Sequence, residues 1–189
     1  MAVNLNNAVR IVGGRYRGRQ LDVLDLEGLR PTPSRVRESI FNLIGSKVEG
    51  ARVLDLFAGS GALGFEAVSR GASSLVLVEK DRDNYEILTE EAASFKGAAI
   101  KTVHQDAMQY LNGCSEQFDL VFLDPPYKAD LLKPSLQLLI KKELITPESI
   151  VYAEMSSLNT TIVPGYEIIR QEEAGQVKFA LLRLSSFLF

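Results

Sequence analysis

Asp55-Leu56-Phe57-Ala58-Gly59-Ser60-Gly61-Ala62-Leu63-Gly64 joins an apolar run, residues 53–57, to a helical pattern that begins near Ala62. Gly59 and Gly61 allow a tight turn and a close approach of the backbone to a ligand, because glycine has no Cβ. A helix N-terminus directly behind such a turn favours an anionic group. The stretch therefore predicts a strand–turn–helix unit with a ligand site at its turn.

Apolar runs and helical patterns alternate after this turn. Strands are expected at 53–57, 75–78, 100–104, 118–123 and 150–154, and helices at 62–69, 83–95, near 108 and at 134–142. Residues 166–172 and 177–184 predict a terminal hairpin. Continuous apolar strands between helices are typical of a parallel sheet covered on both faces. The pattern predicts a doubly wound, Rossmann-like α/β fold, with a mainly parallel seven-stranded sheet and an antiparallel C-terminal hairpin. Ligands of such sheets bind at the carboxyl ends of the strands.

The length of 189 residues indicates one domain with a short appendage. Hydrophobic residues make up 46% of the chain and charged residues 24%, as in ordinary globular proteins. No apolar run approaches the roughly 20 residues of a membrane span, and the polar residues 1–7 lack a signal-peptide stretch. A single cysteine, Cys114, and a single histidine, His104, argue against a structural zinc site, and no metal is expected. A reducing, cytoplasmic setting is the expectation.

Positive charge is concentrated near the N-terminus. Residues 1–47 hold eight Arg and Lys against four Asp and Glu, whereas the remainder holds 13 against 20. An arginine-rich arm on an acidic body suggests a polyanionic partner, and a merely solvated basic surface stays an alternative. We expect a basic N-terminal extension over residues 1–47, packed on a core domain over residues 48–189.

The extension is expected to contain a hairpin and a helix. Residues 9–21 alternate around a glycine pair and predict the hairpin. Thr32 is expected to be the N-cap of the helix, with Pro33 at its first position. The face expected to be buried consists of Val36, Ile40, Leu43 and Ile44. Arg35 and Arg37 fall off that face.

The acidic residues near the glycine turn restrict the ligand. Glu79 ends the second strand, 18 residues after Gly61, where a carboxylate can accept hydrogen bonds from ribose hydroxyls. The glycine spacing also fits a dinucleotide fingerprint, so an NAD-dependent oxidoreductase is one alternative. Asp55 argues against it, because a carboxylate there would repel a pyrophosphate but could receive an ammonium. Little chain is left for a substrate domain. S-adenosyl-L-methionine (SAM) has the required ribose, ammonium and carboxylate.

Asp106 follows the third strand, where it could bond the adenine amine of SAM or act as a helix N-cap, and both roles can hold. The complete set of expected cofactor-binding residues is Thr32, Asp55, Phe57, Ala58, Gly59, Ser60, Gly61, Glu79, Lys80, Asp106 and Ala107.

Asp124-Pro125-Pro126-Tyr127 directly follows the fourth strand and predicts the catalytic loop. An exocyclic amine of a nucleobase is a poor nucleophile, because its lone pair is delocalised into the ring. Asp124 can accept one N–H bond and a prolyl carbonyl the other, which holds the nitrogen toward the methyl group. The prolines stiffen the loop, and Tyr127 offers an aromatic face for stacking the base. A turn with only a structural role stays the alternative.

With these motifs in view, the chain resembles class I SAM-dependent methyltransferases. More specifically, it resembles the bacterial RsmD family of 16S ribosomal RNA guanine-N2 methyltransferases. The residues that carry the resemblance are Arg10–Arg19, Arg30–Thr32, Arg35–Glu38, Asp55–Gly64 and Asp124–Tyr127. The glycine motif is shared by many methyltransferases and the Asp-Pro-Pro-Tyr motif by amino-methyltransferases, so the N-terminal arginine block is the family-specific part.

The resemblance implies transfer of a methyl group to the N2 amine of guanine 966 in 16S rRNA, with an assembling 30S subunit as partner and S-adenosyl-L-homocysteine (SAH) as product. The expected RNA-binding residues are Arg10, Arg15, Tyr16, Arg17, Arg19, Arg35 and Arg37. A monomer without membrane association is expected. Two further alternatives are an amino-methyltransferase that acts on adenine N6 in DNA or RNA, and a non-catalytic RNA-binding assembly factor.

Overall fold

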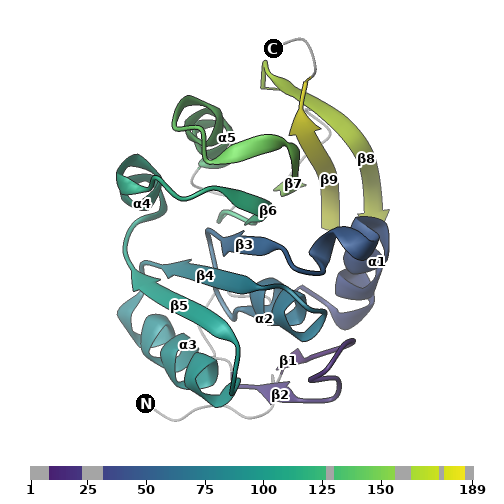
Figure 1. The fold of residues 1–189 in the computed structure, drawn as a ribbon, viewed down its shortest axis with the longest axis vertical. Helices are drawn as coiled ribbons and strands as arrows, with labels where there is room; N and C mark the ends of the chain where they lie inside the picture. Colours follow the sequence, from purple (N-terminus) through teal and green to yellow (C-terminus); the bar gives the residue numbers. More distant parts are fainter. Residues whose placement is uncertain (1–8, 23–31, 127–129, 156–162, 175–176, 186–189) are drawn as a thin grey trace.

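A computed structural model describes residues 9–22, 32–126, 130–155, 163–174 and 177–185 of the chain. Their central feature is a seven-stranded sheet with the order β5-β4-β3-β6-β7-β9-β8 (Figure 1). The strands are β3 (Arg52–Asp55), β4 (Ser74–Glu79), β5 (Ala99–His104), β6 (Phe118–Leu123), β7 (Ile145–Met155), β8 (Tyr166–Ala174) and β9 (Val177–Leu184). Strands β3 to β7 are parallel, and β9 is antiparallel to both β7 and β8. The predicted sheet and its terminal hairpin are confirmed.

Helices cover both faces of this sheet, and its central strands β3, β4 and β6 are mostly buried. One face carries α1 (Ser34–Ile44), the 3-10 turn η2 (Gly45–Val48), α2 (Ala62–Ser69) and α3 (Arg82–Ser94). The other face carries α4 (Ala107–Gly113) and α5 (Leu132–Lys141). Alternate residues of one strand therefore enter different cores: Phe122 packs with the first group and Leu123 with the second. Among the described helices, none is long and apolar enough to cross a membrane.

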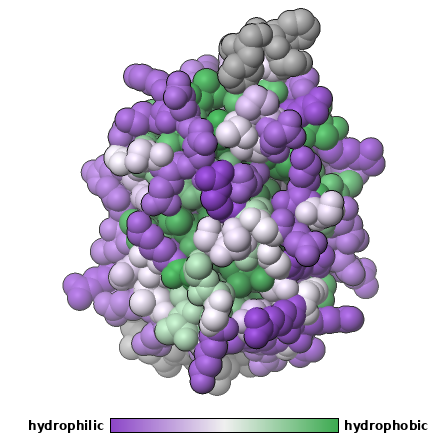
Figure 2. Space-filling model, viewed as in Figure 1, coloured by the Kyte–Doolittle hydropathy of each residue, from purple (hydrophilic) through white to green (hydrophobic). Residues whose placement is uncertain are grey.

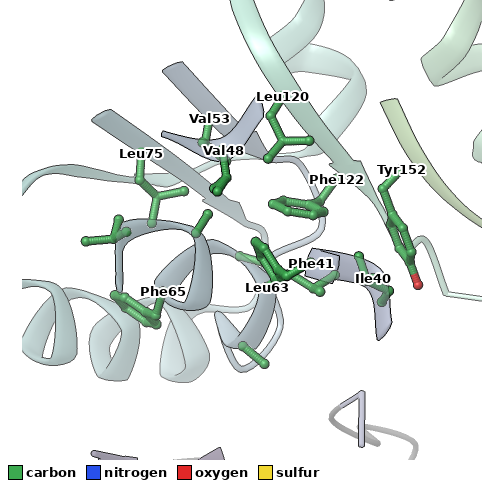
Figure 3. Packing of buried hydrophobic residues seen from close by; sticks show 14 of the residues in the cluster. Ile40, Phe41, Val48, Val53, Leu63, Phe65, Leu75, Leu120, Phe122 and Tyr152 are labelled. Carbon is green, nitrogen blue, oxygen red and sulfur yellow. The ribbon is translucent and has the colours of Figure 1, made fainter. Parts of the chain in front are cut away.

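A row of aromatic rings joins α1 to the middle of the sheet. Phe41 of α1 packs against Phe122 of β6, with ring centroids 5.7 Å apart (Figure 3). Phe122 in turn packs against Tyr152 of β7 at 5.9 Å, and Tyr152 against Phe179 of β9 at 5.3 Å. Tilted and edge-on pairs of this kind contribute about 0.5–1.5 kcal/mol each beyond their buried area. The row holds α1 against β6, the strand that the predicted catalytic loop follows.

The predicted N-terminal hairpin is present as β1 (Val9–Arg10) and β2 (Gln20–Leu21), which pair antiparallel. It lies beside α2 in Figure 1. Backbone N–H of Arg15 donates to the carbonyl of Ser69, the last residue of α2, at 2.7 Å. Gly14 has φ of 76°, and a Cβ there would lie 1.8 Å from the same carbonyl. Glycine is therefore required for this segment, residues 9–22 and here called the arm, to approach the end of α2 this closely.

Several elements begin or end one or two residues from the expected positions, and two differences have a physical reason. Helix α1 begins at Ser34 with Pro33 at the N-cap position and no side-chain cap, so the assignment of Thr32 as N-cap is wrong. Pro33 has no backbone N–H that needs an acceptor, and its backbone is extended before the helix. Helix α1 can therefore begin after Pro33 without a capping hydroxyl. Strand β7 begins at Ile145 rather than at residue 150, because its pairing with β6 is interrupted by a register shift that the apolar pattern does not reveal.

Candidate active site

Acidic side chains gather where neighbouring strands of the parallel sheet end. Asp55 and Glu79 are the last residues of β3 and β4, and Asp124 directly follows β6. Glu154 lies one residue before the end of β7, and Asp106 lies two residues after β5. Parallel strands end at the same edge of their sheet, which is where ligands of such folds bind. The structure thus brings all four acids predicted for the site to one edge and adds Glu154.

The glycine turn between β3 and α2 is closely packed. Gly61 occupies the N-cap position of α2 with φ of 70°, and a Cβ there would lie 2.5 Å from the ring of Phe65. A Cβ at Gly64 would lie 2.7 Å from the side chain of Leu77 on β4. Gly61 therefore shapes the turn, whereas Gly64 lets α2 pack directly on the sheet. The N-terminus of α2 faces the edge that carries the acids.

Asp55 is almost completely buried behind this turn, with 2% of its surface exposed. Its Oδ2 accepts a hydrogen bond from the backbone N–H of Gly64 at 3.0 Å. Burial raises the pKa of Asp55 to about 8; the Gly64 bond lowers it and the negative charge of Glu79 raises it further. A cationic ligand group would stabilise the ionised form, so this carboxyl group is suited to an ammonium.

Glu79 holds the glycine turn in place as well as facing the edge. Its Oε2 accepts hydrogen bonds from the backbone N–H of Gly59 at 3.0 Å and from Nδ2 of Asn84 at 2.9 Å. Its Oε1 accepts from the backbone N–H of Asp81 at 2.8 Å. Asn84, which the sequence reasoning missed, is buried and also donates to the carbonyl of Gly59 at 2.6 Å. An asparagine in the first turn of a helix is common on exposed surfaces, so its sequence position gave no signal.

Asp106 is the N-cap of α4, as one of its two predicted roles requires. Its Oδ1 accepts from the backbone N–H groups of Met108 at 2.9 Å and Gln109 at 3.2 Å. Contact with adenine stays a prediction for this residue. The neighbouring Lys80 is exposed, and its carbonyl lies 3.0 Å from Nε2 of His104. Among the other positions expected to bind the cofactor, the structure buries Ala58, Ser60 and Ala107 and half-buries Phe57.

The start of the predicted catalytic loop lies beside β7. Leu123 pairs with Ala153 in the parallel register of β6 and β7, which places Asp124 next to Glu154. Glu154 is 8% exposed. Burial raises the pKa of Asp124 well above its usual range, and the charges of Glu154 and Asp55 add to the rise. Pro125 is half-buried and Pro126 exposed, while Tyr127 lies outside the described residues.

Glu154 was missed by the sequence reasoning, although a signal for it existed. It stands near the end of the fifth predicted strand, as Glu79 does in the second. The carboxyl ends of parallel strands meet at one edge, so a strand-terminal acid is a candidate wherever it occurs. Among the described residues, no group of three or more His, Cys, Asp or Glu is arranged to hold a metal ion.

The basic residues of the N-terminal extension differ in solvent exposure. Arg10, Arg15, Arg17 and Arg35 are exposed. Arg19 instead donates to the carbonyl of Ser94 at 3.2 Å, near the end of α3, and lies 4.2 Å from the centroid of the Phe95 ring. The ring of Tyr16 packs edge-on against the same Phe95 at 4.7 Å. Arg19 and Tyr16 therefore fasten the arm to α3.

The structure contradicts the exposed, RNA-contacting position expected for Arg37. This residue was expected among the residues that contact RNA, but it is 1% exposed. Its guanidinium donates to the backbone carbonyls of Thr32 and Arg10 and faces Glu66 of α2. The helical periodicity placed it off the apolar face, and a second, polar contact surface with the arm covers that side instead. Thr32 belongs to this cluster through its carbonyl, and nothing in the described structure joins it to the glycine turn.

Comparison with known proteins gives a consistent result over nearly the whole chain. A family model described as "Conserved hypothetical protein 95" matches residues 9–183. Ribosomal RNA small subunit methyltransferase D of Escherichia coli K12 is 39% identical over 175 residues, which cover 92% of this chain and 88% of that protein. A solved structure of yhhF from Escherichia coli is 37% identical, with a TM-score of 0.85, and the match covers 94% of this chain and 98% of that one. A more distant structure, 16% identical with a TM-score of 0.66, was solved in complex with SAH; the match covers 87% of this chain and 52% of that one.

Proposed function

The chain belongs to the family described as "Conserved hypothetical protein 95", and from that membership we propose that it transfers a methyl group from SAM to ribosomal RNA. The relative in Escherichia coli named ribosomal RNA small subunit methyltransferase D supports this reaction. The finer proposal is that the acceptor is the exocyclic N2 amine of a guanine in 16S rRNA, guanine 966 by family resemblance. The protein would act in the cytoplasm, as a monomer.

The residues around the glycine turn fit SAM. Asp55 offers a buried carboxylate for the ammonium, and the N-terminus of α2 favours the carboxylate of the same amino-acid group. Glu79 has lone pairs beyond its three hydrogen bonds with which to accept the ribose hydroxyls. Gly59 and Gly61 both have positive φ, which lets the backbone turn tightly beside the proposed ligand. When bound, SAM supplies the electrophilic methyl group, and the protein supplies alignment.

The residues after β6 fit the acceptor amine. Asp124 would accept one N–H of the amine and the carbonyl of Pro125 the other, so that the nitrogen lone pair points at the methyl group. Tyr127 would stack on the extruded base, whose unstacking costs about a few kcal/mol. Asp124 need not be a strong base, because the proton becomes acidic once the nitrogen carries the methyl group.

The basic arm fits a large polyanionic substrate. Arg10, Arg15, Arg17 and Arg35 are exposed, and we propose that they contact RNA phosphates. Arg19 and Tyr16 would then act by holding the arm to α3. In this proposal residues 1–47 are the RNA-binding extension and residues 48–189 the methyltransferase domain.

One observation carries the proposal furthest: the two candidate subsites lie on adjacent strands. Asp55 pairs with Phe122 in the register of β3 and β6, and Asp124 lies two residues beyond Phe122. The charge of Asp55 contributes to the raised pKa of Asp124, so the two carboxyl groups are close enough to interact. A cationic group bound at Asp55 and an acceptor amine bound at Asp124 would therefore lie next to each other.

Radiolabelled SAM tests the proposal. It is offered with naked 16S RNA, partly assembled 30S subunits and double-stranded DNA, and the labelled nucleoside is identified. We expect N2-methylguanosine from the ribosomal substrates alone. Label on adenine or in DNA would overturn the substrate proposal in favour of another amino-methyltransferase. RNA binding without any methyl transfer would favour an assembly factor, and thermal stabilisation by NAD instead of SAM an oxidoreductase.

A further inference from the structure

We propose that Asn84 is a positioning residue for the cofactor, whose side-chain amide fixes the carboxylate of Glu79 against the glycine turn so that this carboxylate can accept from the ribose of SAM. The inference rests on the proposed function, which assigns the ribose to Glu79. It gives a role to a residue that belongs neither to the glycine motif nor to the acids at the strand ends.

Asn84, Glu79 and Gly59 form a closed triangle of hydrogen bonds. The backbone N–H of Gly59 donates to Oε2 of Glu79 at 3.0 Å. Nδ2 of Asn84 donates to the same Oε2 at 2.9 Å and to the carbonyl of Gly59 at 2.6 Å. Both polar backbone groups of Gly59 are therefore bound by these two side chains, which fixes the turn and the carboxylate relative to each other.

The two acceptors that Asn84 faces require an amide at this position. The carbonyl of Gly59 and the carboxylate of Glu79 have no hydrogen to donate, so the amide nitrogen with its two hydrogens must point toward them. Asn84 is 2% exposed, so these hydrogen bonds are shielded from water. An ionised aspartate has the same shape, but it would have no donor and would bring a second negative charge next to Glu79.

The start of α3 makes the side chain of Asn84 available for this task. Asp81 is the N-cap of α3, and its side chain accepts from the backbone N–H of Asn84 at 2.9 Å. Asn84 is the third residue of the helix, a position from which a glutamate or glutamine often reaches back to the N-cap N–H. Here Oε1 of Glu79 accepts from that N–H, at 2.8 Å. Capping of α3 therefore does not need the side chain of Asn84.

The triangle also determines which oxygen of Glu79 is open to a ligand. Among the described residues, Oε2 accepts two hydrogen bonds, whereas Oε1 accepts one. Each carboxylate oxygen has about two lone pairs, so the remaining capacity lies mainly on Oε1. By binding Oε2, Asn84 leaves Oε1 as the acceptor for a ribose hydroxyl and keeps the carboxylate from rotating. A carboxylate that is fixed before the ligand arrives loses less entropy on binding.

Asn84→Asp tests the inference, because it replaces the amide with a carboxylate of the same shape. Asn112→Asp is the matched control: it makes the same change at an exposed residue of α4, whose Nδ2 donates to the carbonyl of Met108 at 2.9 Å. Calorimetry measures the affinity for SAH and for its 2′,3′-dideoxy analogue, which lacks the ribose hydroxyls. Asn84→Asp should weaken SAH binding about tenfold or more and binding of the analogue at most about threefold. Asn112→Asp should change neither affinity.

Equal losses for the two ligands would overturn the inference, because a merely structural role does not depend on the ribose hydroxyls. Unchanged SAH affinity in Asn84→Asp would overturn it as well. Asn84→Ala, which removes the donors without adding a charge, is measured with the same two ligands if the aspartate variant does not fold. If the unmodified chain binds SAH and the ribose-dependent loss is found, but no RNA is methylated, the failure belongs to the proposed function alone.

Hydrogen exchange in the unmodified chain tests the triangle without any variant. NMR follows the side-chain amide hydrogens of Asn84 and Asn112. Both Nδ2 hydrogens of Asn84 should exchange with solvent more slowly than those of Asn112, because both are buried and hydrogen-bonded. Exchange of either Asn84 hydrogen as fast as in Asn112 would show that the triangle is not formed and would overturn the inference.

Discussion

Nε of Arg37 lies 4.0 Å from Oε2 of Glu66, and both side chains are excluded from solvent. The same glutamate accepts hydrogen bonds from the backbone N–H groups of Val12 and Gly13, each at 2.8 Å, and from Nε of Arg70 at 2.8 Å. One carboxylate thus joins the arm, α1 and α2. Burial lowers the pKa of Arg37, and the negative charge of Glu66 offsets part of this lowering.

Glu66→Ala should therefore destabilise the fold strongly. It leaves the buried guanidinium of Arg37 without its counter-charge and the backbone N–H groups of Val12 and Gly13 without their acceptor, which costs about 3–5 kcal/mol in the free energy of unfolding. Urea denaturation measures the change. The control is Glu86→Ala, which removes an exposed ion pair with Arg82 and should cost less than about 1 kcal/mol. Equal losses in the two variants would show that the cluster does not hold the arm.

Asp55→Asn should stabilise the ligand-free protein at pH 8. The folded pKa of about 8 lies above the ordinary value near 4, so the folded chain holds the proton more tightly. For this group, stability is fully present below about pH 4 and is lost as pH rises toward 8. Asparagine avoids that loss and keeps an acceptor for Gly64.

Thermal unfolding without SAM measures the effect of Asp55→Asn. The variant should melt at least about 2 °C above the unmodified chain at pH 8 and level with it at pH 4. Calorimetry should show weaker SAM binding, because the partner of the ammonium is gone. A variant that melts lower at pH 8 would contradict the buried charge, and unchanged SAM affinity would contradict the ammonium site.

Asp124→Ala should abolish turnover while SAM still binds. The acceptor amine loses one of its two hydrogen-bond partners, and removing one such preorganised group lowers kcat by about 100-fold or more. Methyl-transfer assays measure kcat, and equilibrium dialysis measures SAM binding. Asp119→Asn is the control, on the same strand but in an exposed ion pair with Arg52. A near-normal rate in Asp124→Ala would remove Asp124 from the mechanism.

Replacing both Arg15 and Arg17 by alanine should weaken RNA binding about tenfold. Each exposed guanidinium that neutralises a phosphate contributes roughly 0.7 to the slope of log affinity against log salt for single-stranded RNA, so the slope should fall by about 1.4. Filter binding over a salt series measures both quantities. Arg170 and Arg183, replaced together, are the matched control on β8 and β9. The same loss in the control would point to net charge rather than to the arm.

The sheet was predictable because its central strands are buried on both faces. They therefore appear as apolar runs such as residues 118–123, which match β6 residue for residue. The glycine turn was predictable for a related reason, since Gly61 and Gly64 stand where a Cβ would clash. Strand β7 was predicted too short, because its first part contains polar residues at the register shift.

The tertiary contacts of charged residues were not predictable in the same way. Arg35 and Arg37 both fall off the apolar face predicted for α1, yet one is exposed and the other buried. What separates them is Glu66, 29 positions after Arg37, whose approach depends on the packing of α2. Hydrophobic periodicity predicts which side of a helix is apolar. It does not predict whether another segment of the chain covers the polar side.

Helix α2 ends at the glycine turn on one side and at the docked arm on the other. Its eight residues span about 12 Å at the rise of an α-helix. Gly14 and Arg15 contact its last residue directly, and the arm cannot slide along it without breaking the buried carboxylate contacts. With RNA bound to the arm as proposed, the length of α2 would set the distance between the bound phosphates and the glycine turn. This length would select the nucleotide at a fixed distance from the bound phosphates, so that adding or deleting one helical turn would change which base is presented to the methyl donor.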